Sequence, residues 1–454
     1  MNRTLSVISA AIAFLYFFGG SASAAAITTS TTSNAPGVLI NGTNVSLYVP
    51  YASDNSLKIG SVVKVIEVAP AATAPKTTVL KTGYVNSCAA SPATGIAVCT
   101  GVFGSSYFIR PPNNKVGGFK TGVSKRVHFT GGDCANCGVA IDDTLTGGPT
   151  AIIATSKGYL PVQLSPFQLQ PIISTGSDAV SGQFGYDPMN HRILSPNYVI
   201  LNLKKFNSEN PDYQIIDTGS GSAFELSDRT DFFNSAGTCT TTGGGTTQRD
   251  ALPDSGAYDI TTGIAYGTFR SPSDCIHANT VDDVALFDLT QATFDTNAGT
   301  WSTPGKQVQV LSEMTNMTNG ITGIAVVPGQ SLAIVADRRE ISGSAGFGAL
   351  SLPTTSGSGT PSLKDWVQAE MPNDPSRKIW QMGFMPNGVT AYTSPNNTKG
   401  YGVIINRART YAAVVDIEGL LGASRQSGTA HTLSSSVDLI TSGIVRFVDI
   451  RPGK

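Results

Sequence analysis

The hydrophobic positions of this chain recur as pairs of short apolar runs, each pair separated by a tight polar turn. The segments are "GVLINGTNVSLYVPY", "CAASPATGIAVC", "GVAIDDTLTGGPTAIIAT", "FGYDPMNHRILS", "GAYDITTGIAYGTF", "GIAVVPGQSLAIVA" and "MGFMPNGVTAYTS". Apolar runs this short, bounded by turn-forming residues, predict β-hairpins rather than helices. The residue placed just before each turn is, in order, Asn41, Ser91, Asp142, Asp187, Asp259, Val327 and Met385.

Further apolar runs follow most of these hairpins and predict outer strands: "VVKVIEV", "KRVHF", "YQIID", "VALFDL" and "AAVVDI". A hairpin followed by outer strands, repeated along the chain, predicts an all-β fold with a single β-propeller of seven four-stranded blades. One small twisted sheet cannot bury both of its faces, so blades stack radially until the ring closes. Six or eight blades, a pair of β-sandwich domains and a β-helix are the alternatives.

The two ends of the mature chain are expected to close the ring. The runs "SSVDLI" and "GIVRFVDI", within residues 435–450, remain after the seventh hairpin and can complete the first blade. A strand within "ITTSTTS" can contribute from the N-terminal side. We therefore expect one propeller domain over residues 27–454, with insertions near 219–282 and 336–377.

The repeat resembles that of the YVTN-type and lactonase-like seven-bladed propellers of exported bacterial proteins. In "GAYDITTGIAYGTF…VALFDLTQATF" a turn similar to A-x-D-P-x-T-G precedes an outer strand similar to V-x-V-x-D. The segments "YAAVVDIEGLL" and "GIVRFVDI" also resemble C-terminal parts of such propellers. The resemblance implies the fold strongly and the function hardly at all. Val327 and Met385 depart from it, since the repeat prefers aspartate there.

The N-terminal residues predict export. A basic Arg3, the apolar run "LSVISAAIAFLYFF" and small residues up to Ala26 have the order of a secretory signal peptide over residues 1–26. No later run is long enough to span a membrane, so we expect a periplasmic or extracellular protein without a membrane span. The net charge of −1 and the scattered basic residues argue against a nucleic-acid partner.

Export implies an oxidising compartment, so the six cysteines predict three disulfides. Their spacing favours the pairs Cys88–Cys99, Cys134–Cys137 and Cys239–Cys275. The first pair lies symmetrically about a predicted hairpin turn, which places the two residues opposite each other at a separation that a disulfide tolerates. For the C-x-x-C of "GGDCANCG", a local disulfide is favoured over a labile redox pair, and a zinc site lacks its further ligands.

The aspartates that precede the turns are candidate channel carboxylates. If the blades stack in the same phase, Asp142, Asp187 and Asp259 recur at one level of the ring, where converging oxygens can hold Ca²⁺. The simpler interpretation is a turn role, because aspartate at the first position of a turn accepts a hydrogen bond from the backbone two residues on. The metal content is left open, and no other cofactor is expected.

The sequence favours a binding protein over an enzyme. No serine-hydrolase elbow is present and none of the four histidines has a metal-site spacing. Loops on a rigid ring suit recognition of a protein or a surface polymer. Trp380, Arg338 and Arg339 are the candidate binding-face residues. The alternative is a lactonase-like or quinone-dependent propeller enzyme with its site at the channel mouth.

Overall fold

The structure, a computed structural model, describes the chain in segments. The described residues are 27–29, 35–51, 62–68, 76–83, 85, 87–101, 105–120, 138–155, 158–174, 184–187, 192–197, 212–217, 222–225, 238–240, 246–248, 252–270, 284–288, 293–295, 300–302, 305–308, 321–337, 346–352, 362–367, 386–406, 411–427 and 442–449. The predicted signal peptide and His128, His191, His277 and His431 lie outside them.

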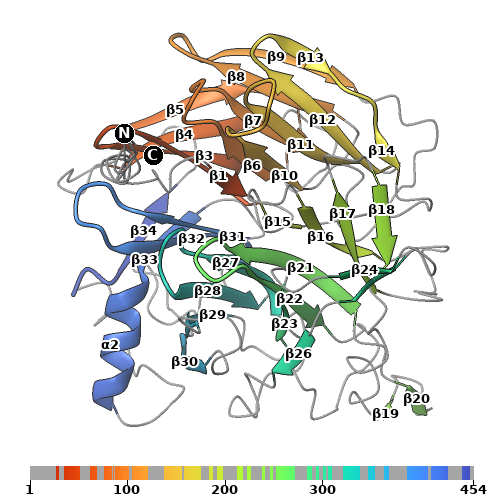
Figure 1. The fold of residues 1–454 in the computed structure, drawn as a ribbon. Coiled ribbons are helices and arrows are strands. Elements are labelled where there is room, and N and C mark those ends of the chain that lie inside the picture. The colour runs from red at the N-terminus through yellow and green to blue at the C-terminus, as the bar shows by residue number, and fades with distance from the viewer. Residues whose placement is uncertain are drawn as a thin grey trace, which may run out of the picture.

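The described residues form antiparallel sheets and one helix, and the sheets are arranged around a common centre (Figure 1). We number the sheets first to seventh in chain order. The first contains β2 (Gly37–Asn41), β3 (Asn44–Tyr51), β4 (Val62–Val68) and β5 (Lys76–Lys81); the second β6 (Ser87–Ala90), β7 (Ala97–Gly101), β8 (Ser105–Arg110) and β9 (Lys115–Lys120); the third β10 (Val139–Asp142), β11 (Thr150–Thr155), β12 (Gly158–Leu164) and β13 (Phe167–Leu169). The fourth contains β15 (Gly185–Asp187), β16 (Arg192–Asn197), β17 (Asp212–Asp217) and β18 (Ser222–Glu225); the fifth β21 (Leu252–Asp259), β22 (Ile264–Arg270), β23 (Val284–Asp288) and β26 (Gly305–Val308). The sixth contains β27 (Ile321–Val326), β28 (Leu332–Asp337), β29 (Gly346–Ser351) and β30 (Ser362–Val367); the seventh β31 (Pro386–Thr393), β32 (Gly400–Asn406), β33 (Tyr411–Asp416) and β34 (Val445–Asp449).

Six further strands are described. The third sheet gains β1 (Ile27–Thr29), which pairs with β10, and β14 (Ile173–Ser174), which pairs with β12. The short pairs β19 (Thr238–Thr240) with β20 (Thr246–Gln248) and β24 (Thr293–Asp295) with β25 (Thr300–Ser302) form separate ribbons.

The predicted hairpins form the first two strands of the sheets. The first six segments turn where the sequence predicts, for example with Ala90 paired to Ala97 in the second sheet. These inner strands are crowded. A Cβ on Gly37 would lie 3.0 Å from backbone atoms of the second sheet, and one on Gly185 2.9 Å from the backbone of Ala257 in the fifth. Small residues are therefore needed where inner strands approach one another.

Neighbouring sheets bury their apolar faces against each other. One cluster joins the second and third sheets through residues such as Val98 and Ile153. Another joins the first sheet to the seventh and contains Val38, Leu47, Val403 and Val414, all at most 7% exposed. The first and last sheets therefore share a hydrophobic core.

Both end strands form, but in sheets other than the one predicted. β34 pairs with β33 and so becomes the outermost strand of the seventh sheet instead of completing the first. β1 pairs with the innermost strand of the third sheet. The prediction failed because a strand's apolar pattern shows that it needs a partner but not which sheet edge supplies one.

A helix that the all-β prediction missed follows β33. This helix, α2 (Ile417–Ser427), is preceded by Asp416, whose Oδ1 accepts a hydrogen bond from the backbone N–H of Gly419 at 2.9 Å. Its residues Ile417, Leu420 and Leu421 pack into the core between the sixth and seventh sheets. The N-cap aspartate and the apolar spacing are helix signals that the sequence contained.

The regions predicted as insertions contain regular parts of the repeat. Residues 336–377 include β29 and β30, the two outer strands of the sixth sheet, and residues 219–282 include β18, β21 and β22. The glycine-rich β29 and the mixed-polarity β30 lack the continuous apolar runs of the predicted outer strands such as "VVKVIEV" and "VALFDL", so the pattern did not reveal them. No helix in the described part of the chain is both long and apolar enough to cross a membrane.

One predicted disulfide is confirmed. Cys88 and Cys99 are direct cross-strand partners in the second sheet and are bonded, with their Cα atoms 4.1 Å apart. Both are fully buried. Cys134, Cys137 and Cys275 lie outside the described residues, and the side chain of Cys239, in β19, is not described.

Candidate functional site

The hairpin turns between first and second strands all lie at one edge of the sheets. Consecutive antiparallel strands reverse direction, so the connections from first to second strand, and from third to fourth, leave the sheet at the same edge. We call this edge the turn face. Its first-to-second turns are residues 42–43, 91–96, 143–149, 188–191, 260–263, 327–331 and 394–399.

The three predicted carboxylates lie on the turn face and are fully buried at the ends of their strands. Asp142 accepts hydrogen bonds from the backbone N–H and the hydroxyl of Thr144 at 2.7 and 2.6 Å. Asp259 accepts one from the backbone N–H of Thr261 at 2.8 Å and one from the hydroxyl of Thr262. For Asp142 and Asp259 these are the turn bonds that the simpler interpretation predicts.

The geometry gives Asp142 and Asp259 a structural role. Tyr186 of the fourth sheet donates its hydroxyl hydrogen to Asp142 Oδ2 at 2.6 Å, so this carboxylate also links two sheets. Burial raises the pKa of Asp259, while the turn hydrogen bonds oppose that rise. Within the described segments, no three His, Cys, Asp or Glu residues form a group that could hold a metal ion.

Asp143, which follows the predicted carboxylate, makes a second link between sheets. Its two carboxylate oxygens accept hydrogen bonds from the Ser91 hydroxyl at 2.5 Å and from the Ala93 backbone N–H at 2.9 Å, both in the turn of the second sheet. Burial raises the pKa of Asp143, and these two hydrogen bonds partly offset the rise. Asp142 and Asp143 are adjacent in the sequence, but the sequence did not show that Asp142 contacts the fourth sheet and Asp143 the second.

The seventh hairpin turns later than predicted. Met385 was expected just before the turn, but β31 begins at Pro386 and the turn is residues 394–399, "SPNNTK". The "PNG" taken for the turn lies at an irregularity in the pairing of β31 with β32, between Pro386 and Gly388. Comparison with "SPATGI" (residues 91–96) would have identified the correct turn, since both begin with Ser-Pro and have the same length.

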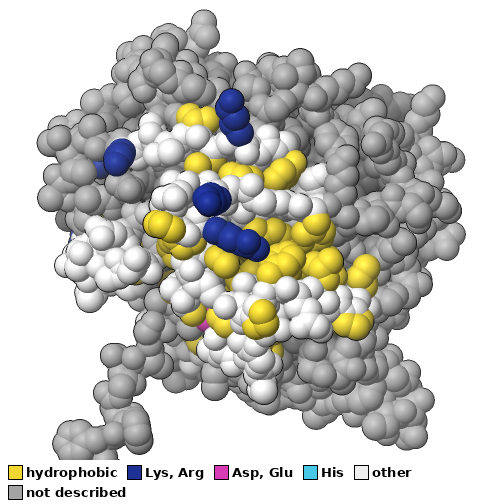
Figure 2. All heavy atoms as spheres, turned by 90° about the horizontal axis from the view of Figure 1, so that it is seen from above, with side chains coloured by type: hydrophobic (Ala, Val, Ile, Leu, Met, Phe, Trp, Pro, Cys, Tyr) yellow, Lys and Arg dark blue, Asp and Glu magenta, His cyan; other side chains and the backbone are white. Residues whose placement is uncertain are grey.

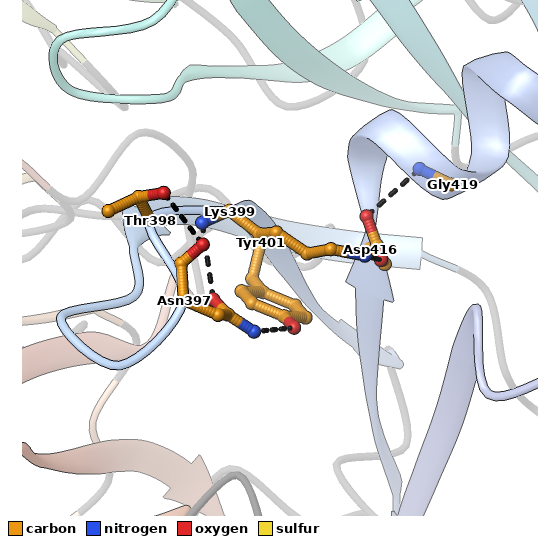
Figure 3. A network of polar contacts seen from close by, with 6 residues as sticks. All are labelled: Asn397, Thr398, Lys399, Tyr401, Asp416 and Gly419. Carbon is orange, nitrogen blue, oxygen red and sulfur yellow. Dashed lines mark hydrogen bonds and ion pairs between the residues drawn. The ribbon is translucent and has the colours of Figure 1, made fainter.

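The turn 394–399 is held by a polar network (Figure 3). The Asn397 amide donates to the Tyr401 hydroxyl at 2.9 Å, and Asn397 Oδ1 accepts from the backbone N–H of Lys399 at 3.1 Å. Lys399 Nζ lies 2.6 Å from Asp416 Oδ2, and this contact raises the pKa of the Lys399 amine. Asp416 therefore joins this turn to the start of α2.

The same turn contacts the sheets on both sides. Gln330 of the sixth sheet donates its amide hydrogen to the Thr398 carbonyl at 2.7 Å. Asn396 donates to the carbonyl of Thr43 in the first sheet at 2.7 Å. The turn face is thus connected across the junction between the last and first sheets.

Most of the long connections leave from the opposite edge, which we call the loop face, whereas residues 289–304 and 417–444, which join third to fourth strands, leave from the turn face. The loop-face connections join second to third strands, or one sheet to the next, and include residues 52–61, 121–138, 198–211, 226–251, 271–283, 309–320, 338–345 and 368–385. Arg338, Arg339 and Trp380 belong to two of these connections, and their positions lie outside the described residues. Strand direction therefore places the strand ends that flank these two connections at the edge opposite to the turn carboxylates.

Comparison with known proteins identifies the fold. No protein-family model matches the sequence, and no curated protein matches it. Hydrazine synthase from Kuenenia stuttgartiensis aligns with 85% of this chain and 96% of its own, at a TM-score of 0.50 and 10% identity. The β-propeller domain of Myceliophteria thermophila Cps50 (Swd1) aligns with 84% of this chain and 95% of its own, at a TM-score of 0.44 and 8% identity. The chain is a β-propeller. At 10% identity, the similarity to hydrazine synthase shows the fold alone.

Proposed function

We propose that this protein is an exported, closed, seven-bladed β-propeller of the YVTN-like repeat type that binds a protein or surface polymer through its loop face. The cluster containing Val38 and Val403, and the hydrogen bond from Asn396 to Thr43, support closure between the first and seventh sheets. The buried disulfide between Cys88 and Cys99 supports an oxidising compartment, periplasmic or extracellular.

The different use of the two edges carries the binding proposal. On the turn face, polar side chains such as Asp142, Asp143 and Gln330 are bonded to backbone or side chains of this chain. Most of the long connections leave from the other edge, where their sequence can vary without disturbing the sheets. Recognition of a macromolecule is the function that this division of roles supports best.

Site-specific crosslinking tests the proposal. A photoreactive amino acid placed next to Trp380, or next to Arg338, is expected to join the protein to its partner in an extract of the cell envelope or culture fluid. The double variant Arg338→Ala/Arg339→Ala and the variant Trp380→Ala should lose the product. The matched turn-face variants Gln330→Ala and Asn396→Ala should keep it, because they alter only intrachain contacts.

Two outcomes would overturn the proposal. One is a crosslinked product that survives all the loop-face substitutions and disappears with the turn-face substitutions. The other is turnover of a lactone, or quinone-dependent oxidation of an alcohol, by the purified protein, which would establish the enzymatic alternative.

A further inference from the structure

The outer edges of the second and third sheets form a seam that begins at the third-to-fourth turns of the turn face and is separate from the loop face. Phe167, in β13, packs against Phe108 and Phe119 of the second sheet, with ring centroids 5.0 and 6.4 Å away. Phe108 is buried, but Phe167 is 44% exposed and Leu169 48%. Exposed large apolar side chains gathered at one place mark interaction surfaces more often than isolated ones do.

Two cations lie at one end of this seam. Arg110 and Lys115 are direct cross-strand partners at the β8–β9 hairpin, and both are exposed. The Arg110 guanidinium lies 5.5 Å from the centre of the Phe167 ring. Like charges directly opposite each other destabilise a sheet. Among the described residues, neither has an acidic partner, so an external anion would relieve their repulsion.

The seam also contains open space between the cations and the aromatic rings. Side chains alternate along a strand, so Lys115, Gly117 and Phe119 share one face of β9, and pairing places Arg110 and Phe108 on the same face. A Cβ on Gly117 would meet no atom within 4 Å. The glycine therefore leaves a gap between the charged end and the aromatic end of the seam.

The edges of both sheets can accept an extended chain. β9 and β13 are the outermost strands of their sheets, and each pairs with a single strand in the described structure. An outermost strand presents backbone N–H and C=O groups that an added strand can pair with. Figure 2 views the molecule from the side of these outer strands, and Lys and Arg side chains lie on and beside its hydrophobic ones.

We propose that this seam binds an extended, acidic polypeptide segment in which a carboxylate contacts Arg110 and Lys115 and an apolar side chain packs on Phe167 and Leu169. The cations select the charge and the exposed rings select the apolar neighbour. Phe167 lies edge-on to Phe108, at an interplanar angle of 86°, within a seam between two sheets. This geometry fits single side chains of a peptide better than the flat surface of a membrane.

Fluorescence anisotropy with a dye-labelled peptide that alternates glutamate with phenylalanine tests the proposal on the intact mature protein. Binding should weaken as salt rises, because the charges are exposed. The variant Arg110→Gln/Lys115→Gln should raise Kd about tenfold or more, since hydrogen bonds to charged groups are the stronger ones. Gly117→Leu, which fills the gap and leaves both charges in place, should do the same.

The control removes an equal charge elsewhere. Lys76→Gln/Lys81→Gln, on β5 of the first sheet, should change Kd less than about twofold, because exposed charges at a distance are screened. Equal binding of a lysine–phenylalanine peptide, or a Kd unchanged by both seam variants, would overturn the proposal. A third outcome would also overturn it: the protein binds no peptide but sediments with phosphatidylglycerol vesicles, and the seam variants do not. The seam is separate from the loop face, so these results leave the crosslinking experiment unaffected.

Discussion

The turns of the second and seventh sheets have the same backbone and different side chains. In the second, Ser91 N–H donates to the Ile96 carbonyl and Gly95 N–H to the Ser91 carbonyl. In the seventh, Ser394 donates to Lys399 and Thr398 to Ser394 in the same pattern. In these two turns the same hydrogen bonds therefore fix the backbone, while each sheet stabilises its turn with its own residues.

The strands that flank the two turns are held together in different ways. The strands beside the first turn are joined by Cys88–Cys99, whereas the matching positions in the seventh sheet are Ala391 and Gly402. A Cβ on Gly402 would collide with the Ile334 side chain of the sixth sheet. One sheet thus uses a covalent bond where the other uses close packing by a neighbouring side chain.

Among the tests of this comparison, removing the disulfide should change the stability of the protein most. Cys88→Ala/Cys99→Ala should lower the free energy of unfolding by about 3 kcal/mol, because the bond closes a short loop in the unfolded chain. Urea unfolding of the oxidised protein and the variant measures the difference. An unchanged unfolding midpoint would show that the packing alone, as in the seventh sheet, is sufficient.

The reverse change should not be tolerated. Ala391→Cys/Gly402→Cys is expected to lower stability by about 1–3 kcal/mol, the usual cost of overpacking a core, since Ile334 occupies the space. The same urea experiment under oxidising and reducing conditions separates bond formation from the steric effect. Stabilisation in oxidising buffer would contradict the role given to Ile334.

Exchanging the left-handed residues of the two turns should have a smaller effect. Gly95 has φ +67° and Thr398 has φ +58°, a conformation that is unfavourable for a β-branched residue. Gly95→Thr should destabilise by about 1–2 kcal/mol, and a Cβ there would also lie 3.1 Å from Pro111. Thr398→Gly should stabilise by up to about 1 kcal/mol. Thermal unfolding of both variants gives the signs, and a loss of stability in Thr398→Gly would contradict the strain assigned to it.

The same two turns show which features of the fold can be predicted from the sequence and which cannot. The alternation in "CAASPATGIAVC" predicted the hairpin, its turn and its disulfide, because each depends on local spacing alone. The seventh turn was misplaced because "PNG" is itself a strong turn signal, which the structure uses at an irregular point in a strand. The links from Asp143 to Ser91 and from Asn396 to Thr43 depend on which sheets are neighbours, which a single hairpin pattern does not contain.

A pH titration of Asp143 should give the smallest effect. Burial raises the pKa of this carboxyl in the folded protein, so the folded state holds its proton more tightly than the unfolded state does. Stability from this group is therefore fully present below the unfolded pKa of about 4 and is lost as pH rises through the folded pKa. The loss should be well under about 1 kcal/mol, because the half-buried group is screened by solvent.

Asp143→Asn cannot ionise, so the stability of the wild type should fall relative to this variant between about pH 4 and pH 7. Urea midpoints at several pH values measure the difference, and a wild type that gains on the variant with rising pH would show that the bonds from Ser91 and Ala93 outweigh burial.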